Sequence, residues 1–167
     1  MAFDTYLSIR SPNVQGEATQ ANHAAWIEIY SFSWGASNPT TVGSGSTGLS
    51  AGKVSVSSFN IMKKTETSSA KLFAACCAGQ HFPTATVEMS KATGTSGQQQ
   101  VFLKYAFTDV MVESVQWSGS SGGDDTPTES VSFAFAKVAI SYLKQDEATG
   151  AMSAAGDASW DLTKVSK

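Results

Sequence analysis

A chain of 167 residues with a formal net charge of −3 is long enough to bury a hydrophobic core as one domain, residues 1–167. Its 11 Lys and Arg residues are scattered, which excludes the concentrated basic face that a nucleic-acid partner requires. Only 15% of the residues are charged, so much of the surface is Ser, Thr and Gly, which a protein partner can cover without removing many charges from water.

The start of the chain shows no Sec signal peptide. Residues 1–6 lack a basic region followed by an apolar run, and the longest apolar run, residues 72–78, is far shorter than the ~20 residues that span a membrane. Cys76 and Cys77 are adjacent, and adjacent cysteines rarely form a disulfide because the ring strains the peptide. We therefore expect synthesis in a reducing cytoplasm, free thiols and no membrane insertion.

Alternation of apolar and polar residues predicts β-strands at residues 3–10 and 25–35. The second of these is the clearer, and its two faces differ. One face carries Trp26, Glu28, Tyr30, Phe32 and Trp34, and the other carries Ile27, Ile29, Ser31 and Ser33. An aromatic face opposite a serine face predicts a core on one side and water, or a wet lumen, on the other.

Residues 36–52 are too rich in Gly, Ser and Thr to build a core, so we expect a long exposed loop. A loop of this length in a compact domain is usually functional or mobile. Residues 53–64 then predict a strand whose apolar parity shifts after Val56, which indicates a bulge or bend. Lys63 and Lys64, at the end of that strand, are expected to be solvated.

One helix is predicted, at residues 68–79. Ser68 or Ser69 can cap its N-terminus, and Gly79 stands where a left-handed C-terminal residue belongs. Its apolar stripe consists of Leu72, Phe73, Cys76 and Cys77. The stripe favours both cysteines as core residues rather than reactive thiols. A helix this short must pack on the sheet to persist.

The rest of the chain again alternates with a period of two. Further strands are expected at residues 83–91, 99–107, 110–117, 128–143 and 158–165. In residues 128–143 the apolar set changes sides after Lys137, from Val131 and its neighbours to Val138 and those that follow. Such a change is typical of a strand that bends between two packed sheets or at the corner of a barrel.

Catalytic and metal-binding motifs are missing from the sequence. His23 and His81 show none of the spacings that bind a metal, and no nucleophile elbow or phosphate-binding motif is present. Asp124 and Asp125 could suggest calcium, but two carboxylates in a Gly-rich loop are more often a solvated turn. Each histidine is interpreted as a turn or strand-end residue that forms hydrogen bonds. We expect no enzyme activity, no catalytic residue, no cofactor and no metal.

These features leave a binding or structural protein, and several kinds remain open. A pilin-like adhesin, a lectin-like or other β-sandwich binding module without a signal sequence, and a ring-forming tube subunit all combine Ser/Thr-rich strand faces with Gly/Ser loops. An adhesin is expected to carry a signal sequence and often a disulfide, and the sequence indicates neither. Composition alone does not decide among the remaining classes.

A set of motifs follows in order along nearly the whole chain. They are MAFDTYL at residues 1–7, GE at 16–17, EIYSFSWG at 28–35, KV at 53–54, SSAKLFAACCAGQHFP at 68–83, VMVESV at 110–115, PTESV at 127–131 and WDL at 160–162. One such motif would be weak evidence. The ordered set resembles the Hcp family, the haemolysin-coregulated tube proteins of the bacterial type VI secretion system.

The resemblance implies a mainly β fold: a two-sheet β-barrel with one flanking α-helix, like a phage tail-tube subunit. It also implies a homo-hexameric ring, stacking of rings into a tube, sheath proteins around that tube, a spike of the VgrG type and small effectors carried in the lumen. Secretion to the extracellular space or a target cell would then run through the type VI apparatus, which agrees with the lack of a Sec signal.

Two groups of residues become candidates through the same resemblance. Ser31 and Ser33 match lumen-facing positions of the family. Ser130 and Ser132 are expected to join them in a wettable wall that accepts varied cargo. The loop 36–52 matches the extended loop that contacts the neighbouring ring. Its candidate contact residues are Ser37, Asn38, Thr41, Gly45 and Leu49.

Overall fold

The structure is a computed structural model that describes residues 2–43, 48–94, 97–123 and 125–166. Gly45 and Asp124, named above, lie outside the described residues. Among these residues the chain forms twelve strands and one helix. Their order is β1 (Asp4–Arg10), β2 (Ile27–Ile29), β3 (Ser31–Ser33), β4 (Ala36–Ser37), β5 (Thr40–Val42), β6 (Leu49–Ala51), β7 (Ser55–Val56), β8 (Phe59–Lys64), α1 (Ser69–Ala78), β9 (His81–Ala92), β10 (Gln99–Ser118), β11 (Thr128–Gln145) and β12 (Met152–Asp161).

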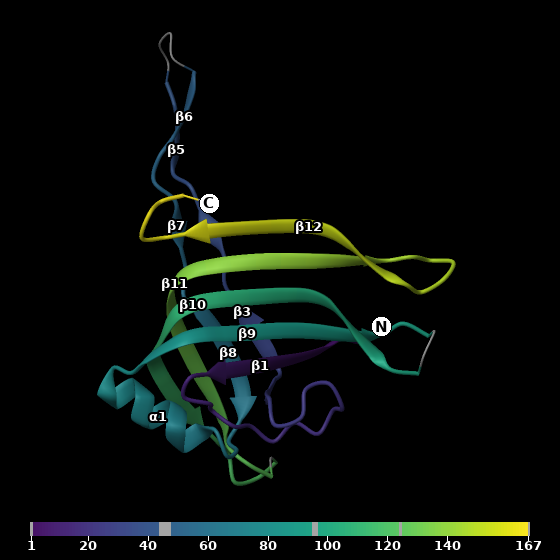
Figure 1. The fold of residues 1–167 in the computed structure, drawn as a ribbon. Coiled ribbons are helices and arrows are strands. Elements are labelled where there is room, and N and C mark those ends of the chain that lie inside the picture. The colour runs from purple at the N-terminus through teal and green to yellow at the C-terminus, as the bar shows by residue number, and fades with distance from the viewer. Residues whose placement is uncertain (1, 44–47, 95–96, 124, 167) are drawn as a thin grey trace.

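The main sheet curls into a barrel. Its strand order is β2-β1-β9-β10-β11-β8-β3, and β12 pairs with β11 beside it. The two ends of this order, β2 and β3, follow each other in the chain through Tyr30, whose backbone N–H donates to the Met62 carbonyl at 2.9 Å. The helix α1 lies on the outside of the barrel (Figure 1). The expected mainly β barrel with one flanking helix is therefore confirmed.

The long strands β10 and β11 turn the corner between the two sheets of the barrel (Figure 1). The first part of β11 pairs with β8, and its second part pairs with β12. Val131 and Phe133 are buried before the corner and Val138 after it, so the predicted change of face is confirmed. On β10 the corner contains Asp109, whose φ of 53° is the left-handed conformation that bends the strand.

An aromatic cluster fills the barrel between the two sheets. Its members are Phe32, Trp34, Phe59, Tyr105, Phe107 and Phe135. Phe107 contacts Phe135 with ring centroids 4.6 Å apart, and Trp34 meets Tyr105 edge to face at 5.2 Å. Full burial of one such ring stabilises a fold by roughly 1.5–3 kcal/mol, so this cluster, with Phe59 and Phe107 buried and the other four partly buried, helps to hold the two sheets together.

The segment predicted as one strand at residues 25–35 is two strands with a switch between them. Ile27 and Ile29 of β2 are buried, whereas Tyr30 is 53% exposed. Phe32 and Trp34 pack against the core after the switch. The prediction that Tyr30 shares the core face was wrong, because the chain passes from β1 to β8 at this residue and its pleat changes sides.

The predicted bend after Val56 is present, but the expected exposure of Lys63 was wrong. Strands β7 and β8 are separated by two residues, and Ser57 N–H donates to the Gly35 carbonyl at 2.9 Å in the break. Lys63 is fully buried, because it shares the inward face of β8 with Phe59 and Ile61. Lys64 points the other way and is exposed.

The helix matches its predicted position within one residue at each end. Gly79 adopts φ 61° and ψ 39°, the expected left-handed C-terminal conformation. Ser68 precedes the helix without a side-chain capping bond. Cys76 is half-buried and packs against the core, whereas Cys77 is exposed, so the interpretation as a core residue was wrong for Cys77. The helix buries Leu72, as predicted, together with Ala75.

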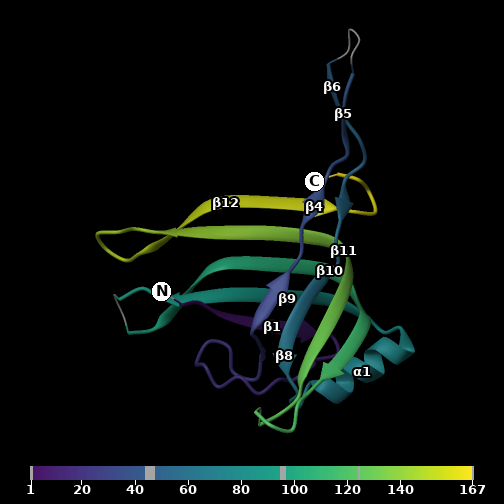
Figure 2. The same ribbon diagram turned by 180° about the vertical axis from the view of Figure 1, so that it is seen from behind.

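Residues 36–52 were expected to be an irregular loop, and this was wrong in part. They form a hydrogen-bonded hairpin in which β5 pairs with β6, and β4 at its root pairs with β7, just after residue 52. This hairpin, called the arm below (residues 36–52), projects away from the barrel (Figures 1 and 2). The expected exposure is confirmed, because every residue of the arm that the structure describes is exposed.

The last strand starts and ends earlier than predicted. It covers Met152–Asp161, whereas residues 158–165 were expected. The Asp161 carboxylate accepts the backbone N–H groups of Thr163 at 2.9 Å and Lys164 at 3.2 Å, which turns the chain and ends the strand. The Thr163 hydroxyl also donates to this carboxylate. That bond is the largest of the contacts that lower the pKa of Asp161, and the two backbone N–H groups add to it.

Gly16 allows residues 14–26 to lie close against β2. Its N–H donates to the Ala25 carbonyl at 2.8 Å, and a Cβ at this position would lie 2.3 Å from the Trp26 carbonyl oxygen. We predict that Gly16→Ala lowers the free energy of unfolding by about 1–3 kcal/mol, because backbone must shift to make room. Urea denaturation measures the change. Gly122→Ala, where the added Cβ meets nothing within 4 Å, is the control, and equal effects of the two changes would contradict this account.

Candidate functional site

A polar face covers the outside of the sheet formed by β3, β8, β11 and β10. Two rows cross these strands in register: Ser31, Met62, Ser130 and Gln116 in one, and Ser33, Asn60, Ser132 and Ser114 in the other. These eight residues are called the serine face below. Paired residues of antiparallel strands project to the same side, so the four strands present one continuous surface.

The serine face is uncharged and slightly hollowed. A depression of about 250 Å³ lies over β3 and β8, between Ser31, Ser33 and Ser130. The Ser132 hydroxyl donates to Asn60 Oδ1, which ties the second row together across two strands. Hydroxyl and amide groups can donate and accept hydrogen bonds, so this face can be wetted or can contact varied polypeptides without removing a charge from water.

The sequence grouped four residues of this face correctly and missed the other four. Ser31, Ser33, Ser130 and Ser132 lie together, although about a hundred residues separate the two pairs in the chain. The missed members are Asn60, Met62, Ser114 and Gln116. Two of them could have been predicted from the sequence, because Asn60 and Met62 alternate with the buried Phe59 and Ile61 and so lie on the opposite face of the strand.

The candidate contact residues of the arm have different places in the hairpin. Ser37 pairs with Ser55 at its root. The Asn38 side chain accepts the Gly52 N–H at 2.9 Å, and the hydroxyls of Thr41 and Ser50 lie 2.5 Å apart, so both residues hold the hairpin together. Leu49 is different, because its side chain is 70% exposed.

A buried ion pair joins β8 to β11 beneath the helix. Lys63 and Glu129 are directly opposite each other in the ladder, both side chains are fully buried, and the Lys63 amino group donates to Glu129 Oε1. The same amino group donates to Ser69 Oγ at 3.1 Å and to the Lys64 carbonyl at 2.9 Å. All three ammonium donors are therefore used. Ser69 donates to Glu129 at 2.9 Å, so the first residue of α1 is fastened to the barrel.

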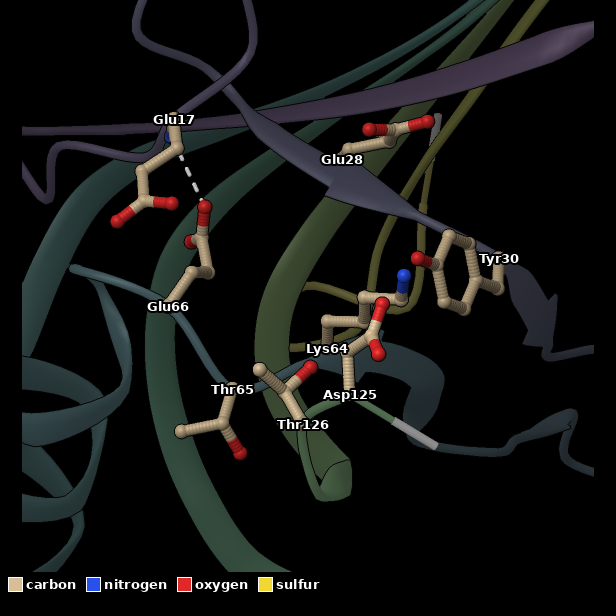
Figure 3. A pocket seen from close by; sticks show the side chains of 8 residues that line it. All are labelled: Glu17, Glu28, Tyr30, Lys64, Thr65, Glu66, Asp125 and Thr126. Atoms are coloured by element: carbon tan, nitrogen blue, oxygen red, sulfur yellow. Dashed lines mark hydrogen bonds between the residues drawn. The ribbon is translucent and has the colours of Figure 1, made fainter. Parts of the chain in front are cut away.

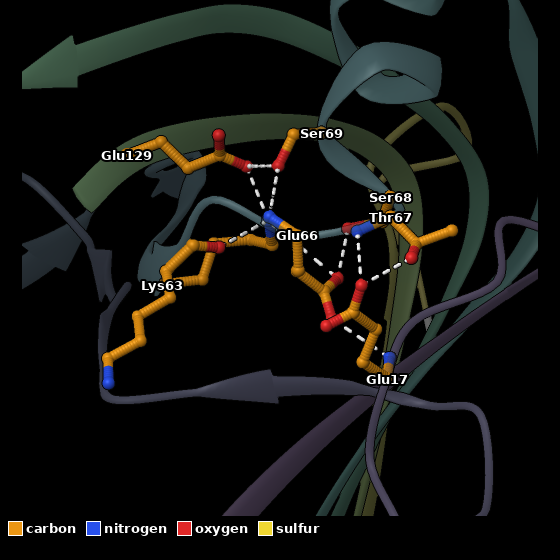
Figure 4. A network of polar contacts seen from close by, with 8 residues as sticks. Glu17, Lys63, Glu66, Thr67, Ser68, Ser69 and Glu129 are labelled. Atoms are coloured by element: carbon orange, nitrogen blue, oxygen red, sulfur yellow. Dashed lines mark hydrogen bonds and ion pairs between the residues drawn. The ribbon is translucent and has the colours of Figure 1, made fainter. Parts of the chain in front are cut away.

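A second set of polar contacts links this ion pair to residue 17 (Figure 4). Glu66 accepts the Glu17 backbone N–H at 2.9 Å and the Ser68 hydroxyl. Glu17 in turn accepts the hydroxyl and the backbone N–H of Thr67. The bond from the Thr67 hydroxyl is the largest of several contacts that lower the pKa of Glu17. The chain before β2, the turn before α1 and the helix itself are thereby held as one unit.

The two histidines form hydrogen bonds, as the sequence predicted. His23 is buried, stacks on Tyr6 with ring centroids 4.5 Å apart and lies 2.8 Å from Glu88 through Nε2. Burial, followed by the charges of Asp4 and Glu28, raises the pKa of Tyr6. His81, at the start of β9, is exposed and lies 2.9 Å from an Asp109 carboxylate oxygen. Among the described residues, the hydrogen-bond partners of the two histidine rings are Gln20, Glu88 and Asp109. None of these is a cysteine or serine that a histidine could activate.

An acidic pocket of about 230 Å³ lies between β2, the end of β8 and the turn before β11. Four carboxylates line it, those of Glu17, Glu28, Glu66 and Asp125. Figure 3 shows Lys64 and Asp125 beside the ring of Tyr30, and the Lys64 amino group lies 5.7 Å from the centre of that ring. Among the residues that the structure describes, no three His, Cys, Asp or Glu side chains are arranged to hold a metal ion.

No helix in the described parts of the chain is long and apolar enough to cross a membrane. This finding concerns the ten-residue α1, whose exposed side carries Lys71, Phe73 and Cys77.

Comparison with known proteins identifies relatives over nearly the whole chain. The family model described as "Type VI secretion system effector, Hcp" matches residues 6–142. The protein Hcp1 of Pseudomonas aeruginosa is 36% identical over 145 residues, which cover 87% of this chain and 86% of that protein.

Solved structures agree with the sequence comparison. A structure described as a type six secretion system protein superposes with a TM-score of 0.89 at 38% identity and covers 98% of both chains. Hcp1 from Salmonella typhimurium superposes with a TM-score of 0.77 at 30% identity and covers 99% of both chains. The resemblance in the ordered motifs is confirmed, and the adhesin and binding-module alternatives are set aside. The chain belongs to the Hcp family, the tube proteins of the type VI secretion system.

Proposed function

We propose that this chain forms hexameric rings, that the rings stack into the inner tube of a type VI secretion apparatus, and that the serine face lines the lumen. Family membership supports the tube. The observation that carries the placement of the lumen is the serine face itself, an uncharged polar surface four strands wide, on the side of this sheet opposite the aromatic core.

The serine face suits a lumen because of its small, neutral side chains. A tube wall that carried charges of one sign would attract or repel cargo according to its net charge. Hydroxyl groups exchange bonds with water for bonds with a polypeptide at little net cost, so effectors of different sequence can be accepted. Met62, which is 46% exposed, adds a flexible apolar contact within the same surface.

The remaining partners follow from the tube. A contracting sheath would surround it, a spike of the VgrG type would cap it, and small effectors would travel in its lumen. The chain would be made in the cytoplasm and exported by the apparatus to the extracellular space or a target cell. Its role is structural rather than catalytic, in keeping with the family.

Replacement of Ser33 by Trp tests the lumen. The indole would fill the depression between Ser31 and Ser130, so we expect the amount of a cognate effector that co-purifies with the rings to fall at least about tenfold, which corresponds to about 1.4 kcal/mol. The ring size, measured by gel filtration and negative-stain microscopy, is expected to stay the same. Ser121→Trp, in the exposed turn between β10 and β11, is the matched control. Unchanged effector retention in intact Ser33→Trp rings would refute the lumen assignment.

A further inference from the structure

His23 is a titratable group inside the fold that the proposed tube does not use. Its side chain is only 1% exposed. The ring lies against the face of Tyr6, with centroids 4.5 Å apart and planes 12° apart, and meets Trp26 edge to face at 4.8 Å. It belongs to residues 14–26, the stretch before β2, which is called the latch segment below. Packing on two sides fixes the ring, so each nitrogen can be matched to its partner.

Both nitrogens of the His23 ring face an oxygen. Nδ1 lies 2.6 Å from Gln20 Oε1, and Nε2 lies 2.8 Å from Glu88 Oε2. The backbone N–H of Asn22 donates to the same Gln20 atom at 2.9 Å, so this atom is the carbonyl oxygen of the amide and not its nitrogen. A neutral imidazole has one N–H, whereas the imidazolium has two. The geometry therefore fits a ring that carries both protons.

The charges on β9 and β10 agree with a protonated ring. Glu88 contacts His23 through one carboxylate oxygen, and the other lies 3.5 Å from the Lys104 amino group. The lysine favours the ionised form of Glu88, which has no proton to give to the imidazole. Glu88 thus supplies the negative charge that a buried imidazolium needs.

The groups on β1 and β2 agree as well. The face of the Tyr6 ring attracts a cation at this distance. Glu28 on β2 is directly opposite Tyr6 in the ladder and adds a second negative charge on this side. Burial, followed by the charges of Asp4 and Glu28, raises the pKa of Tyr6, so its phenol keeps its proton while histidine titrates.

The latch segment is connected to the helix α1. Gly16 N–H donates to the Ala25 carbonyl at 2.8 Å, so the two ends of the segment bond to each other. Glu17 accepts the backbone N–H of Thr67, and its own N–H donates to Glu66 at 2.9 Å. A change at His23 can therefore reach the turn before α1 through bonds that already exist.

We propose that His23 makes residues 14–26 a pH-sensitive latch, which the protonated ring fastens to β1 and β9 and which loss of one ring proton releases. Histidine side chains change charge between about pH 5 and pH 8. At the acidic end of this range both ring nitrogens donate. As the pH rises one nitrogen keeps a lone pair that faces an oxygen, and such a buried contact is unfavourable. The closed latch holds the extra proton, so its stability is lost as the pH rises.

Hydrogen exchange measured by mass spectrometry tests the latch. A proton held only in the closed state changes the opening equilibrium by up to about tenfold per pH unit. We expect the protection of residues 14–26, corrected for intrinsic exchange, to fall at least about tenfold from about pH 5.5 to about pH 8.5. The chain has two histidines, so His81→Phe is the matched control and should keep this fall. Protection of β11 should not change with it.

Two variants identify the sensor. His23→Phe keeps the stacked ring without its protons, so the pH dependence of residues 14–26 is expected to vanish. Glu88→Gln protects the test against a poorly folded His23→Phe. Its amide can accept from a protonated Nε2 or donate to a neutral one, so both states of the ring are satisfied and the pH dependence is again expected to vanish.

The outcomes are separate from those of the proposed tube. A fall of less than about twofold in the parent chain, where a held proton allows up to about tenfold per pH unit, would overturn the latch. So would a full fall in Glu88→Gln, or loss of the fall in His81→Phe, which would make the exposed His81 the sensor. The measurement is made on whatever species gel filtration isolates, so a latch found in a chain that forms no rings would stand while the ring proposal fails.

Discussion

Replacement of Lys63 by Met is expected to lower the free energy of unfolding by about 3–5 kcal/mol. Lys63 and Glu129 are both fully buried, so loss of the ammonium leaves the Glu129 carboxylate without its counter-ion in the protein interior. Ser69 still donates to that carboxylate, but a hydroxyl bond does not offset the charge. Urea denaturation at constant protein concentration measures the loss, because assembly would otherwise change the apparent stability.

Two further variants make this prediction specific. The double variant Lys63→Met with Glu129→Leu removes both charges and is expected to recover most of the lost stability, since an apolar pair of similar volume can replace a buried ion pair. Lys71→Met, on the exposed side of α1, is expected to change stability by no more than about 0.5 kcal/mol. If Lys63→Met were as mild as Lys71→Met, the ion pair would not hold the helix to the barrel.

Shortening of the arm is expected to abolish tubes and leave the fold intact. Removal of residues 41–50 leaves Pro39-Thr40-Ala51-Gly52, and the Gly52 N–H already donates to the Pro39 carbonyl at 2.8 Å. This is the bond that closes a four-residue β-turn, so the shortened chain can join without strain. The core loses nothing, because Val42 and Leu49 are exposed. Stacking would lose one contact for every subunit of a ring, and the effect is therefore large.

Negative-stain microscopy and sedimentation at high protein concentration measure this effect. The parent chain is expected to form both rings and tubes, and the shortened chain rings alone. Urea denaturation is the control for folding, with an expected change within about 0.5 kcal/mol. Tubes formed by the shortened chain would show that the arm is not needed for stacking.

The sequence predicted those features that depend on local alternation. The change of face at Lys137 in β11 and the bend after Val56 are both visible as shifts of apolar parity, and the structure contains both. The left-handed Gly79 follows directly from the helix stripe that precedes it. The pairs Ser31 with Ser33 and Ser130 with Ser132 alternate with core residues, so their strand faces were readable from the sequence, whereas their grouping in one wall came from the family resemblance.

The features that were missed depend on contacts between distant segments. Lys63 is buried only because Glu129, far away in the chain, comes opposite to it across β8 and β11. Tyr30 is exposed because the strand before it pairs with β1 and the strand after it pairs with β8. The described residues of the arm are exposed and its strands are only two or three residues long, so its Gly/Ser composition gave no sign of a ladder.

The central claim, that this chain works by assembling with itself into rings, is tested most directly by native mass measurement combined with negative-stain microscopy. The account predicts a main species of six times the 17.5 kDa chain mass, seen as rings with a central hole. A single species of 17.5 kDa at all protein concentrations, with no rings in the micrographs, would contradict it.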